Sequence, residues 1–151
     1  MTKLLVDSCV FINALKEDSV HREQCLAFLE MLASTNQPVM MPAHGWFEVW
    51  CSLRRIEHVD KTFKGVGVNG QWNFPFELIH IDDCFIFKYG NVEIPYIKAG
   101  DHIFLVVAYV NRYPLVTTDK GMAKVAKQIG VSVFSPSEYM ASAKGTDRGQ
   151  R

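Results

Sequence analysis

The sequence lacks the features of several large classes of protein. Its four cysteines form no CxxC pair, so neither a disulfide framework nor a zinc-ligand spacing is present. No apolar run approaches the roughly 20 residues that span a bilayer, and the N-terminus has no signal-peptide pattern. Sixteen basic and sixteen acidic residues cancel, so net charge favours neither nucleic acid nor a membrane as a partner. These absences predict reduced cysteines, no membrane association and a cytoplasmic location.

Several catalytic motifs are also missing. Neither G-x-S-x-G nor H-E-x-x-H occurs, which excludes the common serine hydrolases and zincins. Phosphatases with a nucleophilic aspartate carry a second acid two residues later, and that position after Asp7 is Cys9. Residues 65–70 match G-x-G-x-x-G, but the flanking residues predict no strand before it and no helix after it. We therefore expect no dinucleotide site, and interpret residues 61–75 as a glycine-rich loop without an assigned role.

Apolar strands alternate with helical patterns along the chain, which predicts an α/β fold with helices on both faces of a mostly parallel sheet. The expected strands are residues 3–6, 38–42, 76–81, 113–118 and 131–134. The expected helices are residues 10–16, 19–32, 43–58, 82–90, 99–112 and 119–130. We expect four to five strands in one domain over residues 1–140, followed by a polar tail at 141–151.

Four acidic residues occupy positions that invite a functional interpretation. Asp7 and Asp119 each follow an expected strand, and Asp101 begins an expected helix that is apolar nearly all round. Aspartate is a favoured helix N-cap, so capping is a sufficient explanation for each of them alone. Glu48 is different, because it lies in mid-helix between apolar residues, and its simplest alternative is a solvated helix face.

Taken together, the four acids predict a metal site. Residues just past the carboxyl ends of parallel strands share one edge of the sheet, where ligands bind. Clustered carboxylates repel each other and raise their own pKa values unless a cation compensates them. A set of oxygen ligands without histidine or cysteine favours Mg²⁺, with Mn²⁺ as an alternative, over zinc.

With these acids placed, the chain resembles PIN domains, most closely the small VapC-type toxin ribonucleases of toxin–antitoxin pairs. The matching segments are "LLVDSCVF" at the start, Glu48 on its helix, "AGDHIFLVVA" around Asp101, and "LVTTDKGMAKVA" followed by "VSVF". The resemblance spans residues 3 to about 139 and implies a PIN-like three-layer sandwich. It also implies a metal-dependent endoribonuclease that leaves a 5′-phosphate and a 3′-hydroxyl.

The resemblance assigns roles to individual residues. Asp7, Glu48, Asp101 and Asp119 would hold one or two Mg²⁺ ions, which activate a water molecule and offset charge on the leaving oxygen. The hydroxyls of Ser8 and Thr117 would hold the neighbouring carboxylates or a metal-bound water. Four basic residues are candidates for contacts with RNA phosphates: Arg54, Arg55, Lys120 and Lys124.

The same resemblance implies an RNA substrate, a small antitoxin that covers the groove, and a homodimer. His102 departs from the pattern, because small residues usually follow the third acid, and we interpret it as a solvent-facing residue at a helix start. Many members carry a further acid or asparagine after the fourth acid, and "DKGM" has neither. The number of bound metal ions, one or two, is therefore undecided. The main alternative is a catalytically silent PIN-like domain that binds RNA or protein as a scaffold.

Overall fold

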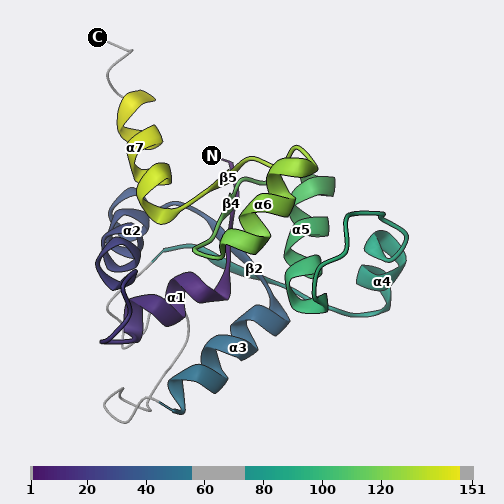
Figure 1. The fold of residues 1–151 in the computed structure, drawn as a ribbon, viewed down its shortest axis with the longest axis horizontal. Helices are drawn as coiled ribbons and strands as arrows, with labels where there is room; N and C mark the ends of the chain where they lie inside the picture. The colour runs from purple at the N-terminus through teal and green to yellow at the C-terminus, as the bar shows by residue number, and fades with distance from the viewer. Residues whose placement is uncertain (1, 56–73, 147–151) are drawn as a thin grey trace.

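The computed structural model describes residues 2–55 and 74–146 of the chain (Figure 1). Five strands are present in this part: β1 (Leu4–Val6), β2 (Val39–Pro42), β3 (Phe76–Ile79), β4 (Leu115–Val116) and β5 (Val133–Phe134). The helices of the same part are α1 (Ser8–Leu15), α2 (Arg22–Thr35), α3 (Ala43–Leu53), α4 (Asp83–Tyr89), α5 (Ala99–Asn111), α6 (Lys120–Gln128) and α7 (Pro136–Thr146).

The five strands form one sheet in the order β3-β2-β1-β4-β5, and every neighbouring pair is parallel. The central strand β1 pairs with β2 on one side and with β4 on the other, so that Leu5 lies opposite both Met40 and Leu115. The predicted fold class, an α/β protein with a central parallel sheet, is confirmed.

The strand order fixes where the helices lie. The chain moves outward from β1 to β3 and then returns to the opposite side of β1 for β4 and β5. Because crossovers between parallel strands are right-handed, this reversal places the connecting helices of the two halves on opposite faces of the sheet. Accordingly, α1 contacts α2 and α3 in one group, whereas α5 contacts α4 and α6 in the other; Figure 1 shows the groups on either side of the strands.

The core lies along the three central strands. All residues of β1, β2 and β4 are buried, whereas the edge strands β3 and β5 are mostly half-buried. A close approach joins the two helix groups, because a Cβ built on Gly45 of α3 would lie 2.6 Å from Cζ of Phe104 on α5. Phe104 is itself 1% exposed. The small residue at position 45 therefore allows α3 to pack directly against α5.

The structure differs from the expected elements mainly at the ends. Residues 136–146 form the helix α7, which contacts α2 and includes the first six residues of the expected polar tail. Ser19, expected to begin the second helix, instead bonds Asn13, and α2 begins at Arg22. The G-x-G-x-x-G segment and the end of the expected helix 43–58 lie outside the described residues. Within the described residues, no helix is both long enough and apolar enough to cross a membrane.

Candidate active site

The sheet brings two of the predicted acids to one edge. Asp7 directly follows β1, and Asp119 lies three residues beyond the end of β4. Since β1 and β4 are hydrogen-bonded parallel neighbours, both acids lie past the carboxyl ends of adjacent strands. The connection from β3 reverses direction across this same pair of strands, and such a switch point is where open α/β sheets bind ligands.

Asp7 is buried and tightly held. Its side chain is only 4% exposed, and it accepts hydrogen bonds from Thr117 Oγ1 at 2.7 Å, Cys9 Sγ at 2.8 Å and Ser8 Oγ at 3.2 Å. Although Asp7 precedes α1, its side chain makes no capping hydrogen bond. Burial raises the pKa of this carboxyl, and the three donors act in the opposite direction. The capping explanation therefore does not account for Asp7.

Ser8 connects Asp7 to the helix α3. Besides its contact with Asp7, Ser8 Oγ donates to Glu48 Oε2 at 2.7 Å. Glu48 is exposed, as expected for a residue on a solvated helix face. Its Oε1 nevertheless lies 3.5 Å from a Cβ built on Gly100 of α5. One hydroxyl thus holds the carboxylates of residues 7 and 48 together, beside the beginning of α5.

Asp101 lies in the first turn of α5, where the N-cap is Lys98. Lys98 Nζ approaches Asp101 Oδ2 at 3.5 Å, and the Asp101 side chain is 15% exposed. Burial raises the pKa of Asp101, Lys98 opposes that shift, and repulsion from the carboxylates of Asp119 and Asp7 adds to it. The charged form of Lys98 is favoured by Asp101 first and then by Asp119 and Glu48. Asp7 and Asp119 therefore act on Asp101 through the local electrostatic field, and Asp119 and Glu48 act on Lys98.

Asp119 does cap a helix. Its Oδ1 accepts from the backbone N–H of Met122 at 2.9 Å, at the start of α6. Its own N–H donates to Thr117 Oγ1 at 2.9 Å, and that same hydroxyl donates to Asp7. Thr117, which is 3% exposed, therefore joins the two acids that follow β1 and β4. The capping interpretation explains one oxygen of Asp119 and leaves the other uncommitted to the cap.

The chemistry of these residues fits a divalent cation. Carboxylate oxygens that are partly buried and repel each other are the ligands that Mg²⁺ and Mn²⁺ prefer. Among the described residues, Lys98 is the only basic side chain within ion-pair distance of any of the four acids. Over the same residues, however, no three histidine, cysteine or acidic side chains lie close enough to form a ready-made ligand set. The donor set therefore fits a divalent cation in chemistry and charge but not in its spacing over the described residues.

Two residues of this region were not anticipated from the sequence. Cys9 donates to Asp7 and accepts from Thr118 Oγ1 at 3.0 Å, and burial together with Asp7 raises the pKa of its thiol, which favours the protonated donor. Lys98 lies three residues before Asp101, a spacing that places two residues on one side of a helix start. That spacing was the available signal for Lys98. Nothing in the local pattern indicated the bond from Cys9 to Asp7.

The four basic residues that were predicted to meet RNA lie on the surface. Arg54 and Arg55 are exposed just after α3, and Lys120 and Lys124 are exposed on α6. His102, expected to face solvent, is half-buried in the first turn of α5.

Comparison with known proteins supports the fold. The family model of the PIN domain matches residues 4–128. A solved structure described as "Structure of FitAB bound to IR36 DNA fragment" is similar with a TM-score of 0.50 and 18% sequence identity, over 88% of this chain and 94% of that chain. At this identity the likeness shows a shared fold alone. The search of curated proteins gave no match.

Proposed function

The chain belongs to the PIN-domain family, and from this premise we propose that it is a Mg²⁺-dependent endoribonuclease, the toxin of a toxin–antitoxin pair. PIN domains are generally nucleases and typically use divalent metal ions. The proposed nuclease domain is residues 1–140, although the helix α7 continues beyond this boundary to Thr146. The proposed partners are an RNA substrate, a small antitoxin protein and a second copy of the chain.

One observation supports the proposal above the others. Asp7 is buried, accepts three hydrogen bonds from side chains and makes no side-chain capping bond, although it occupies the N-cap position of α1. Among the described residues it has no basic partner within ion-pair distance. Burial disfavours the charged carboxylate more than its hydrogen-bond donors favour it, and a cation supplied from outside would offset the difference. A protein under selection for stability alone would gain by an apolar residue here, so the position favours a ligand-binding role.

The proposed roles of the residues follow from their contacts. Asp7, Glu48, Asp101 and Asp119 would hold the metal ion, whose chemistry when bound would be to activate a water molecule and offset charge on the phosphate. Ser8 would orient the carboxylates of Asp7 and Glu48, because its single hydroxyl proton can be shared between Glu48 Oε2 at 2.7 Å and Asp7 Oδ1 at 3.2 Å. Thr117 positions Asp7 and the backbone of Asp119, in the manner of groups that orient metal ligands. Lys98, which is 75% exposed, lies where it can meet a substrate phosphate.

The test is Mg²⁺-dependent cleavage of a structured RNA pool by the purified chain. We expect the wild type to produce fragments with 5′-phosphate and 3′-hydroxyl ends, and both Asp7→Asn and Asp101→Asn to lose turnover while remaining folded. Asp83→Asn is the matched control, because it removes one negative charge from an exposed position on α4 and should cut at the wild-type rate.

Two outcomes would contradict the proposal. Cleavage by Asp101→Asn at the parental rate would show that the site assignment is wrong. If neither the wild type nor the variants cut while all of them bind RNA, the silent scaffold is the correct interpretation. Co-expression with a neighbouring small open reading frame tests the antitoxin, and light scattering tests the dimer.

A further inference from the structure

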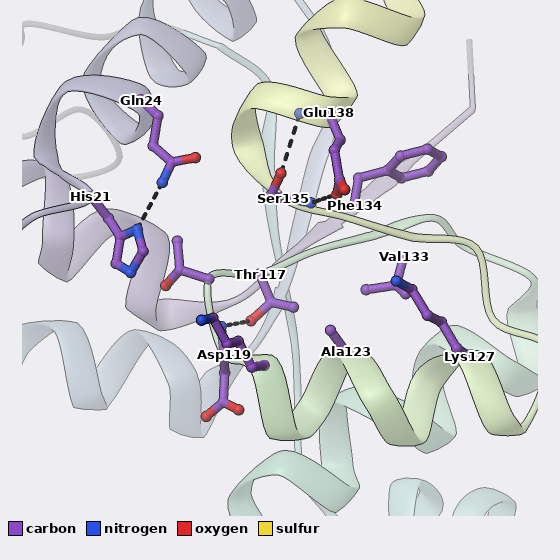
Figure 2. Close-up of a pocket in the computed structure, with 12 residues that line it drawn as sticks. His21, Gln24, Thr117, Asp119, Ala123, Lys127, Val133, Phe134, Ser135 and Glu138 are labelled. Carbon is purple, nitrogen blue, oxygen red and sulfur yellow. Dashed lines mark hydrogen bonds between the residues drawn. The ribbon is translucent and has the colours of Figure 1, made fainter.

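A second feature lies beside the acidic cluster. A cavity of about 260 Å³ opens at the carboxyl ends of β4 and β5, between the start of α2, the helix α6 and the start of α7. Figure 2 shows His21 and Gln24 facing the Ser135–Glu138 turn across this cavity. Pockets for small ligands usually measure about 300–1,000 Å³, so this one is suited to a single small unit.

The cavity and the acidic cluster share two residues. Thr117 and Asp119 line the cavity, and the same residues connect to Asp7 through the Thr117 hydroxyl. In Figure 2 the carboxylate of Asp119 points away from Ser135 and Glu138. A chain of nucleotides that passes over Asp119 can therefore present one phosphate to the acids while its neighbouring unit enters the cavity.

One wall of the cavity offers a hydrogen-bond donor from one residue and an acceptor from another. Gln24 Nε2 lies 2.7 Å from His21 Nδ1. An amide nitrogen only donates, so Nδ1 accepts and the proton of the neutral ring lies on Nε2. The Nε2–H lies on the side of the ring away from Gln24, so His21 offers a donor and Gln24 Oε1 an acceptor at two separate points of the wall. Unpaired bases expose donors and acceptors on more than one edge, and proteins read single-stranded RNA through these groups.

The opposite side of the cavity supplies positive charge. Lys120 and Lys127, both exposed on α6, line it, whereas Lys124 on the same helix does not. Glu138 also lines the cavity, and Lys127 helps to lower its pKa. The Glu138 carboxylate accepts from the Ser135 N–H, and the Glu138 N–H donates to Ser135 Oγ. The polar groups of Ser135 and Glu138 at the start of α7 are thus hydrogen-bonded to each other. The two lysines are the groups that can meet a phosphate.

We propose that this cavity binds one unpaired nucleotide of the RNA substrate beside the cleaved bond. His21 and Gln24 bond the base, and Lys120 and Lys127 face a phosphate. The inference rests on the proposed endoribonuclease function and adds to it a subsite for a single-stranded nucleotide. Of the two lysines on α6 predicted to meet RNA, it selects Lys120, and it adds Lys127 in place of Lys124.

The test is titration of the four nucleoside 5′-monophosphates into the full chain in metal-free buffer, followed by calorimetry. At least one should bind, and Gln24→Ala and Lys127→Ala should each weaken its affinity about tenfold, the loss of one charge-assisted or base-specific hydrogen bond. Lys124→Ala is the matched control on the same helix and should change affinity less than about twofold, because general attraction is all that it removes. Glu138→Gln should tighten binding, because it removes a competing charge and keeps the helix cap.

The results separate this inference from the proposed function, because the titration needs neither metal nor cleavage. Failure of all four monophosphates to bind at millimolar concentration overturns the subsite. Equal effects of Lys127→Ala and Lys124→Ala also overturn it, even where the chain cuts RNA. If binding depends on Gln24 and Lys127 but no RNA is cut in Mg²⁺, the nucleotide site stands and the nuclease assignment fails.

Discussion

Thr117 is the residue whose replacement tests the structure of the acidic cluster most directly. Its buried hydroxyl donates to the Asp7 carboxylate at 2.7 Å and accepts from the Asp119 N–H at 2.9 Å. Thr117→Val keeps the shape of the side chain but removes both bonds. A bond to a charged group contributes about 1.5–3 kcal/mol, and a buried N–H left unpaired costs about 1–3 kcal/mol. Since valine recovers part of this through burial, we expect a net loss of about 3 kcal/mol in the free energy of unfolding.

The measurement is urea unfolding in metal-free buffer, with Thr117→Ser as the matched control. Serine keeps the hydroxyl and loses only a methyl group, at about 1 kcal/mol. The Thr117 bond lowers the pKa of Asp7, so in the valine variant this carboxyl protonates more readily. The loss should accordingly be larger at pH 8 than at pH 5. If valine proves as stable as serine, or if its cost does not depend on pH, the described link between the two acids is wrong.

Three further predictions concern the same region. Mg²⁺ should raise the melting temperature by binding the folded state only. The rise should be larger in Lys98→Met, which lacks the cation facing the acids. An equal rise in the two proteins would argue that Lys98 and Mg²⁺ do not offset the same negative charge. The folded-state pKa of Asp101 is raised, so the folded state binds this proton more tightly than the unfolded chain does. In metal-free buffer the wild type should therefore gain stability relative to Asp101→Asn as the pH falls from neutral through the raised pKa. A flat difference across urea titrations would refute that sign. Gly45→Ala should lower stability, because overpacking against Phe104 costs about 1–3 kcal/mol and outweighs a helix-propensity gain of about 1 kcal/mol; a more stable variant would show that the ring moves freely.

Much of the secondary structure followed from local pattern. Short apolar runs predicted all five strands, because a buried parallel strand must be apolar on both faces. The helix α7 was missed, although Ser135 and Glu138 have the spacing of a capping box. The residues of α7 have little apolar helical periodicity and so resembled a polar tail. Contact with α2 stabilises the helix where that periodicity is weak. Secondary structure that depends on a distant partner leaves little trace in its own sequence.

The sequence by itself determined which residues carry charge near the ends of strands, and the order of those strands along the chain. Only the tertiary structure decided that β1 and β4 are neighbours and that one hydroxyl joins Asp7 to Asp119. It decided as well that the side chain of Asp119 makes a capping bond and that the side chain of Asp7 does not. It also decided that a cavity with its own polar groups lies beside them. The physical reason is range: helix and strand periodicity is set by neighbours a few residues away, whereas the burial and coupling of a carboxylate depend on groups that only the completed sheet brings together.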